Sequence, residues 1–500
     1  MMAVANRAWL TVASLAAPIW AFAQAPASIG TEERQSIEKQ LIELREMRRD
    51  MVRRMQDWDE RIAALETELQ AALPESAAQR SPGAPVSTIG EPPTEGNVAQ
   101  KDRWGAFEPG RGFVLARTEL GEVDFSVFSY VRYLNQRALD HDYTDAFGRT
   151  TRLDLRNDIQ FQKVTLNFKG WFIDPDFRYL FYTWTSNTSQ GDPAQVVVAG
   201  NLSYTFNEHL SLAAGIGALP TTRSTNSTFP NWLKNDHRTI ADEFFRGSYT
   251  TGVWASGTIV PGLRYRAMIG NNLSQLGVNA AQLDDSFNTA SAAVWWMPTT
   301  GEYGPGAGLG DFEQHERPAT LLGAHFTHSR EDAQAQPGTE GFENSQLRLS
   351  DGTLIFSRDP FGTGGVIRKA TYEMLALNSG VKYRGWSLEG EFYYRWLDDF
   401  LTVGPIPVSE LTDYGFQVQG STMLLPRRLQ AYAAYSKIFG DYGEPWDVSV
   451  GVNWFPFERK ETHFSVQALY LKDSPVGYSS VPFAVGGNGW VLSTDAIVNF

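Results

Sequence analysis

The residues of this sequence that could act on a solute are arginines set between apolar residues. Arg264 and Arg266 alternate with Leu263, Tyr265 and Ala267. In an extended strand the two arginines share one face and lie roughly 7 Å apart. Arginine stays charged at any working pH and offers a planar fork to carboxylate or phosphate. Because rings of such groups at a constriction favour anions, this spacing predicts attraction of anions rather than catalysis.

Alternation of the same kind places other charged residues on one face of the expected strands. Seven residues are our candidates for lining a pore and attracting anions: Arg132, Lys163, Arg264, Arg266, Arg223, Lys234 and Arg238. The expected strands place nine basic residues and five acidic ones on the inward face. The basic ones are Arg132, Lys163, Lys169, Arg178, Arg264, Arg266, Lys382, Arg395 and Arg428, and the acidic ones are Glu122, Asp124, Glu389, Glu391 and Asp495. This excess indicates an anion preference, and the alternative is that the charges only solvate a wide interior.

A long connection near residues 220–248 is expected to fold inward. It adds four basic residues and three acidic ones: Arg223, Lys234, Arg238 and Arg246 against Asp236, Asp242 and Glu243. The chain as a whole carries a net charge of −14, but the net charge is not the charge of the interior.

Enzymatic and metal-binding interpretations find little support among the seven histidines. His325 and His328 are three residues apart on an expected strand, so they point to opposite faces and cannot share a metal. His209 with Ser211 comes nearest to a catalytic set at one rim, and both lie beside an expected tight turn. The glycine-rich run 304–308 is not followed by Lys-Ser or Lys-Thr, as a phosphate loop would be. We expect no enzyme, no metal, no cofactor and no nucleic-acid partner.

The elements that would position these charges are short strands. From residue 112 to residue 500 apolar and polar residues alternate over roughly ten positions at a time, which is the signature of strands with two different faces. We count about sixteen such segments, beginning near residues 122, 158, 177, 194, 209, 249, 262, 289, 319, 371, 386, 413, 428, 447, 461 and 490.

Composition fits strands that cross a membrane. Aromatic residues make up 13% of the chain, yet the mean hydropathy is only −0.30. A membrane barrel averages its lipid-facing and water-facing residues and gathers aromatics at the two interfaces. A large soluble β-sandwich array shares these averages. Together with the alternation they predict an all-β fold, a transmembrane antiparallel β-barrel of about 16 strands over residues 112–500.

The connections between segments support the count. Tight links are expected near 174–176, 207–208, 261–262, 384–385, 426–427 and 456–460. They always join an even segment to the next odd one, whereas the longest connections, near 220–248 and 330–370, join odd to even. Short periplasmic turns and long external loops alternate in this way in outer-membrane barrels. The connection 298–318 is the exception, since it is too long for a tight turn.

The N-terminus predicts export. Arg7, the apolar run 8–19 and the sequence Ala21-Phe22-Ala23 form a secretory signal over residues 1–23. The absence of cysteine is compatible with an oxidising compartment. No later stretch approaches eighteen unbroken apolar residues, so no helical membrane span is expected.

Residues 24–72 are expected to form a periplasmic α-helical coiled coil. With Ile37, Leu44, Met51, Trp58 and Leu65 as d positions, the a positions are Leu41, Arg48, Met55, Ile62 and Leu69, of which only Arg48 is polar. This 3.5-residue repeat favours a self-associating helix, and the alternative is a lone amphipathic helix on another surface. Residues 73–111, with several Pro, Gly, Ser and Ala and no periodicity, are expected to be a linker.

Two short runs and the terminal residue of this sequence resemble those of a known family. Leu115-Ala116-Arg117-Thr118, the strand Val164–Gly170 and the terminal Phe500 resemble phosphate-selective porins of the O and P family. The order of signal, coiled coil and barrel is similar to dicarboxylate-uptake porins with N-terminal coiled coils. The resemblance implies the bacterial outer membrane with its lipid as surroundings, a homotrimer, small anionic solutes, and insertion by the barrel-assembly machinery through Phe500. The arginine ladder and lysine cluster of the phosphate porins do not map onto residues of this sequence.

The function expected from these observations is passive diffusion of small hydrophilic solutes through the outer membrane, with a preference for anions such as phosphate or carboxylates. The alternative is a structural protein that ties the outer membrane to the cell wall through its coiled coil.

Overall fold

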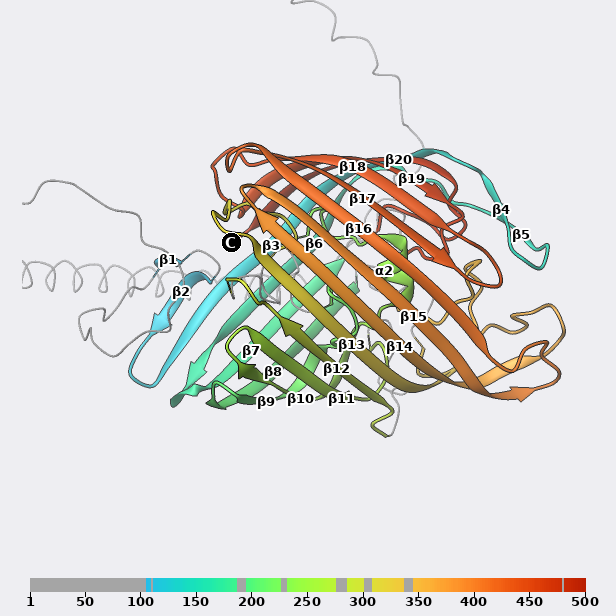
Figure 1. Ribbon diagram of the computed structural model, residues 1–500, viewed down its shortest axis with the longest axis horizontal. Coiled ribbons are helices and arrows are strands. Elements are labelled where there is room, and N and C mark those ends of the chain that lie inside the picture. Colours follow the sequence, from blue (N-terminus) through green and yellow to red (C-terminus); the bar gives the residue numbers. More distant parts are fainter. Residues whose placement is uncertain are drawn as a thin grey trace, which may run out of the picture. The chain divides into compact units, whose positions relative to one another are not determined.

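Sixteen antiparallel strands close into a barrel in the computed structural model (Figure 1). The structure describes residues 105–108, 111–186, 195–225, 232–275, 286–300, 308–336, 345–478 and 481–500. The expected signal peptide, the expected coiled coil and most of the expected linker lie outside these residues. Every barrel strand pairs with the next one along the chain, and β20 pairs with β3 to close the ring.

The barrel strands follow the alternation of the sequence. They are β3 (Gly121–Leu139), β6 (Asn157–Phe172), β7 (Asp174–Ser186), β8 (Gln195–Asn207), β9 (Leu210–Ala218), β10 (Tyr249–Val260), β11 (Leu263–Gly270), β12 (Thr289–Trp296), β13 (Ala319–Asp332), β14 (Val366–Tyr383), β15 (Trp386–Val403), β16 (Leu411–Leu425), β17 (Leu429–Phe439), β18 (Trp446–Trp454), β19 (Thr462–Lys472) and β20 (Gly489–Asn499). Each expected segment corresponds to one of them, so the all-β barrel of sixteen strands is confirmed.

The two faces of the wall differ as the alternation predicts. On β15, Leu388 and Phe392 are 54% and 41% exposed on the outer face. Glu389 and Glu391, between them in the sequence, are buried inside the barrel. A strand with a period of two presents its apolar residues outward and its polar residues inward, as a barrel in lipid requires.

Aromatic side chains form a band on the outer face of neighbouring strands. The ring of Trp446 stacks on Tyr470 at 5.2 Å between centroids, and Tyr470 meets Trp490 edge-on at the same distance. Tyr414 stacks on Phe439 at 4.8 Å. Bands of this kind mark the depth of a membrane interface in transmembrane barrels.

The tight turns join the strands that were expected to be joined by them. Arg384 and Gly385 connect β14 to β15, with φ angles of +49° and +85°. Two consecutive positive φ values are those of a type I′ turn, whose twist matches that of the flanking strands. In the described residues no helix is long and apolar enough to cross a membrane.

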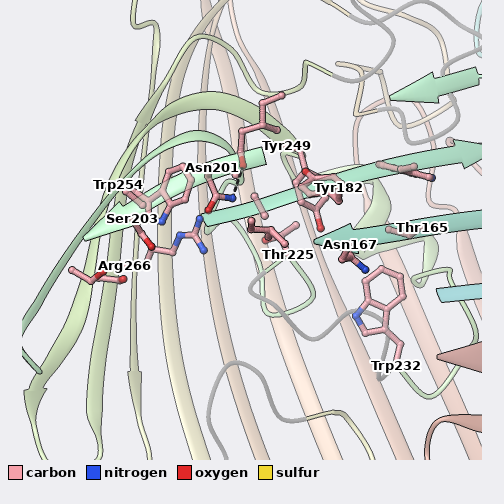
Figure 2. A pocket seen from close by; sticks show the side chains of 18 of the residues that line it. Thr165, Asn167, Tyr182, Asn201, Ser203, Thr225, Trp232, Tyr249, Trp254 and Arg266 are labelled. Carbon is pink, nitrogen blue, oxygen red and sulfur yellow. Dashed lines mark hydrogen bonds between the residues drawn. The ribbon is translucent and has the colours of Figure 1, made fainter. Parts of the chain in front are cut away.

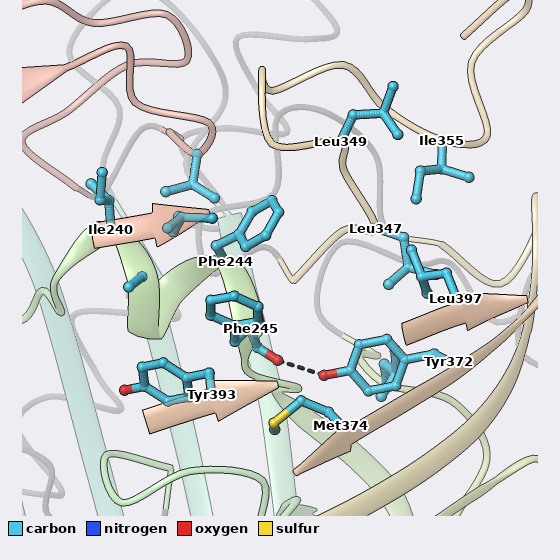
Figure 3. Close-up of a cluster of buried hydrophobic side chains, with 14 of the residues drawn as sticks. Ile240, Phe244, Phe245, Leu347, Leu349, Ile355, Tyr372, Met374, Tyr393 and Leu397 are labelled. Carbon is cyan, nitrogen blue, oxygen red and sulfur yellow. Dashed lines mark hydrogen bonds between the residues drawn. The ribbon is translucent and has the colours of Figure 1, made fainter. Parts of the chain in front are cut away.

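The long connection between β9 and β10 folds into the barrel. It carries the short helix α2 (Ile240–Phe245), capped by Thr239, and α2 packs against the inner faces of β15 to β18. The ring of Phe245 stacks on Tyr393 at 5.1 Å, and the Tyr372 hydroxyl donates a hydrogen bond to the Phe245 carbonyl oxygen (Figure 3). We call residues 219–225 and 232–248 the inward segment.

The connection between β12 and β13, which was too long for a tight turn, crosses the barrel end that carries the tight turns. The Asp311 carboxylate accepts a hydrogen bond from the Gly385 backbone N–H at 2.7 Å. The Glu313 carboxylate lies 3.0 Å from Arg427 and 2.9 Å from Lys460, which belong to two other turns. The count of sixteen strands therefore stands, and the extra residues tie three turns together.

Two further strands precede the barrel. β1 (Phe107–Glu108) pairs with β2 (Gly112–Arg117), and β2 pairs with β3. β20 ends where the backbones of Val127 and Phe500 exchange two hydrogen bonds, and β2 continues along the same edge of β3, with Phe113 5.6 Å from the Phe500 ring. The expected linker, residues 73–111, thus contains β1, because pairing with β2 orders a stretch that has no periodicity of its own.

Between β3 and β6 the short strands β4 (Asp142–Thr144) and β5 (Thr150–Arg152) form a separate hairpin.

Candidate functional site

A cavity of about 470 Å³ lies inside the barrel, between the inner faces of β6 to β11 and the inward segment. Figure 2 shows Arg266, Trp254, Ser203 and Asn201 grouped on one side of it, and Trp232, Asn167 and Thr165 on the other. Five aromatic residues line it: Tyr182, Trp184, Trp232, Tyr249 and Trp254. Its charged lining residues are Lys163 and Arg266, and no described residue that lines it carries a carboxylate.

The sheet register places Arg266 beside Trp254. Arg266 on β11 pairs with Ser256 on β10, and Trp254 is the next inward-facing residue of β10. The guanidinium carbon of Arg266 lies 5.0 Å from the centre of the Trp254 ring, a cation–π arrangement. Gly217 on β9 leaves room for this pair, since a Cβ atom there would lie 2.9 Å from the Trp254 ring and 3.1 Å from Arg266 Nη2.

Arg266 carries the charge in this cavity that is not neutralised. It forms no ion pair with a described residue, and its buried Nε has no hydrogen-bond partner among them. A buried donor without a partner costs about 1–3 kcal/mol, which a bound acceptor would recover. Arg264, two residues earlier on the same inner face, is exposed and lies outside the cavity lining.

Lys163 lines the same cavity, but its charge is neutralised. Its ammonium group lies 2.8 Å from the Asp236 carboxylate and 4.4 Å from the centre of the Trp184 ring. The Tyr130 hydroxyl donates a 2.6 Å hydrogen bond to the same carboxylate. Asp236 belongs to the inward segment, so the contact ties that segment to the wall.

Three other candidate residues are also paired with carboxylates. Arg132 lies 2.7 Å from Asp495. Arg223 lies 3.3 Å from Glu389. Arg238 lies 3.4 Å from a carboxylate oxygen of Glu243. The expected excess of positive charge is therefore smaller than a residue count indicates, because a carboxylate offsets the cost of burying each of these three cations and cancels much of its charge.

Lys234, the remaining candidate, is buried in the inward segment, and its ammonium group has no hydrogen-bond partner among the described residues. Burial lowers the pKa of Lys234 to about 8, and the carboxylates of Asp447 and Asp242 oppose that decrease. The ammonium group of Lys234 therefore loses its proton more readily than usual, and no described residue forms a hydrogen bond with it.

Several other expected interior charges lie near the rims. Arg428 is exposed and hydrogen-bonds Glu458 through its Nε at 2.7 Å, and Arg178 is exposed. Lys382 donates to the backbone carbonyl oxygen of Gly308 in the long β12–β13 connection.

The histidines behave as the strand phase predicts. His325 points inward and lies 2.9 Å from the Asn378 side chain, whereas His328 points outward and lies 3.1 Å from Glu373. The described residues contain no group of three or more His, Cys, Asp or Glu that could hold a metal.

The aromatic part of the cavity was not found from the sequence. Trp254 alternates with Val253 and Ala255, so its phase places it with Thr250 and Ser256 on the inner face. The alternation of the sequence was therefore sufficient to place Trp254 inside the barrel. Nothing in the sequence placed Trp232, which comes from the inward segment.

Neither a protein-family profile nor a curated protein matches this sequence. The solved structures that the fold resembles are outer-membrane porins and channels. The anion-selective porin from Comamonas acidovorans is 10% identical, with a TM-score of 0.46 over 76% of this chain and 100% of its own. The outer-membrane channel DcaP of Acinetobacter baumannii is 11% identical, with a TM-score of 0.45 over 77% of this chain and 99% of its own.

The outer-membrane protein OmpT of Vibrio cholerae, in a trimer form, is 11% identical, with a TM-score of 0.45 over 76% of this chain and 100% of its own. Likeness of this degree leaves the function to be argued from the chain's own residues.

Proposed function

We propose that this chain is an outer-membrane porin through which small hydrophilic solutes diffuse, with a preference for anions such as phosphate or carboxylates. The observation that carries the proposal is the cavity inside the barrel, where the described lining residues include an arginine without an ion pair among them and no carboxylate.

The wall supports the membrane location. Its outer face is apolar and carries an aromatic band, while polar and charged side chains face inward. A sixteen-stranded barrel is wide enough to leave an aqueous channel. The bacterial outer membrane is the compartment proposed for this chain, with a periplasmic coiled coil and association into a homotrimer as further parts of the proposal.

The charge balance supports the anion preference. Lys163, Arg132 and Arg223 are each matched by a carboxylate, so their fields largely cancel. Arg266 has no such match among the described residues. At an effective dielectric constant of about 20, a unit charge attracts an anion 4 Å away by about 4 kcal/mol, so one unpaired arginine is enough to bias passage.

The test is a reversal potential in a KCl gradient across a planar bilayer. We expect anion selectivity for the wild type and a clear decrease for Arg264→Gln/Arg266→Gln. Arg428→Gln is the matched control, because this exposed arginine is paired with Glu458 outside the cavity. Cation selectivity of the wild type would overturn the anion preference. The structural alternative, a tether between membrane and cell wall, does not use the cavity, and a folded protein without conductance would favour it.

A further inference from the structure

We propose that the cavity binds monocarboxylates that have a flat apolar body, of which aromatic carboxylates are the simplest class. This inference rests on the proposed function, because the solute must enter the barrel to reach the cavity. It adds to that function a specific subsite and a kind of solute.

The number of free charges in the cavity indicates one negative charge on the solute. Lys163 and Arg266 are the cations of the lining, and Asp236 occupies Lys163 at 2.8 Å. Among the described residues of the lining, Arg266 remains to meet an anion. A second carboxylate or a doubly charged phosphate would be desolvated here without a second free cation, which is costly in a partly buried site.

The carboxylate end of the solute has its donors in place. Arg266 lines the cavity, and its buried Nε–H has no hydrogen-bond partner among the described residues. A carboxylate that accepted from this Nε–H and an adjacent Nη–H would be bound in a bidentate manner. Ser256 is paired with Arg266 on the neighbouring strand. The hydroxyl groups of Ser256 and Ser203 line the cavity as well. In Figure 2 Ser203 and Asn201 lie beside Arg266.

The remainder of the solute would meet aromatic rings. Trp254 flanks the guanidinium, and Trp232 extends from the inward segment on the other side of the cavity. Tyr182 and Trp184, alternate residues of β7, also line the cavity. Rings favour flat apolar partners, with pairs worth about 0.5–1.5 kcal/mol beyond the area they bury. Inorganic phosphate or acetate would leave these rings uncovered.

The size of the cavity agrees with a small organic solute. Its volume of about 470 Å³ lies within the range of roughly 300–1000 Å³ that is usual for ligand pockets. Gly217 keeps part of that volume open, because any side chain there would push Trp254 or Arg266 into it.

The test uses the full chain in a planar bilayer with a constant KCl background and measures the concentration of added solute that interrupts half of the ion current. The solutes are benzoate, acetate, inorganic phosphate, terephthalate (a second charge) and benzyl alcohol (no charge). We expect benzoate to act at concentrations at least about tenfold below those of the other four. Equal potency of benzoate and acetate, or of benzoate and benzyl alcohol, would overturn the proposal.

Variants locate the site. Arg266→Gln and Trp254→Leu should each weaken the benzoate effect at least about tenfold, and Trp254→Phe, which keeps a ring, should retain most of it. The matched controls are Arg428→Gln and Trp296→Leu, the latter on the outer face of β12, and both should leave the effect unchanged. If Trp254→Leu does not fold, Arg266→Gln still tests the site.

The two proposals can fail separately. Anion selectivity in KCl without any preference for benzoate overturns the aromatic subsite and leaves the porin proposal standing. A benzoate effect that survives Arg266→Gln overturns the assignment of the site.

Discussion

The ammonium group of Lys163 lies 2.8 Å from a carboxylate oxygen of Asp236, so a cation of the barrel wall is neutralised by the segment that folds inside the barrel. The same carboxylate accepts a hydrogen bond from Tyr130 on β3. One aspartate therefore positions the inward segment and, by pairing with Lys163, leaves Arg266 as the available cation among the described lining residues. The proposed anion preference depends on this pairing as much as on the number of basic residues.

Removing the negative charge of Asp236 should free Lys163. Asp236→Asn keeps the shape of the side chain and tolerates the positive φ of +52° at this position. We expect the reversal potential in a KCl gradient to shift further toward anions. The double variant Asp236→Asn/Lys163→Met should return to a value near the wild type, and a shift toward cations in the single variant would contradict the pairing.

A methyl group at Gly217 should narrow the cavity. In Gly217→Ala the new Cβ would lie 2.9 Å from the Trp254 ring, and the ring has to move. We expect single-channel conductance to fall while the barrel folds normally, as judged by its heat-modifiable migration in electrophoresis. Gly420→Ala on the outer face of β16, where a Cβ would meet nothing closer than 3.3 Å, is the control and should conduct like the wild type.

The anion preference should decrease as the pH rises through about 8. Burial places the pKa of Lys234 at about 8, below its ordinary value of 10.5. The folded protein therefore loses this proton above pH 8, while the unfolded chain keeps it up to about pH 10.5. Unfolding free energy should rise with pH between these values, because the unfolded state binds more protons. Reversal potentials between pH 6.5 and 9.5 measure the loss of charge, and Lys234→Met should abolish the step.

A charge on the outer face of β6 should destabilise the barrel, whereas a charge on its inner face should not. Leu166 and Thr165 are adjacent residues with opposite phases, and Thr165 lines the cavity. Leu166→Arg should lower the unfolding free energy by roughly 2–4 kcal/mol if the residue lies near the midplane of the membrane. Thr165→Arg should fold like the wild type. Urea titrations in lipid vesicles, followed by tryptophan fluorescence, compare the two, and equal behaviour would refute the assigned faces.

Removing the residues before β1 should leave the stability of the barrel unchanged, whereas removing β1 and β2 as well should lower it. Deletion of residues 24–103 keeps β1 and β2, and we expect unfolding at the same urea concentration as the full chain. Deletion of residues 24–119 also removes Arg111, which pairs with Asp124 at 2.8 Å, and bares the edge of β3 beyond Phe500. This longer deletion should unfold at a lower urea concentration. Equal stability of the two deletions would show that β2 does not support the closure.

The sequence by itself determined the strands, their number and the face of each side chain. The period of two is a local property: whether Leu388 or Glu389 meets lipid follows from its neighbours alone, because successive side chains of a strand point to opposite faces. The same rule placed Arg266 and Arg264 inside the barrel. The tight turns were equally local, since a glycine such as Gly385 adopts the positive φ of the turn without strain.

Only the tertiary structure decided which interior charges are free. Arg132 and Asp495 are 363 positions apart and meet because β20 closes onto β3. Lys163 and Asp236 meet because a connection folds back into the barrel, and Gly217 matters only because Trp254 lies against it. Alternation gives the face of a residue but not its neighbours across the interior. A charge and its partner are brought together by closure and by loop insertion, and these depend on contacts between residues far apart in the chain.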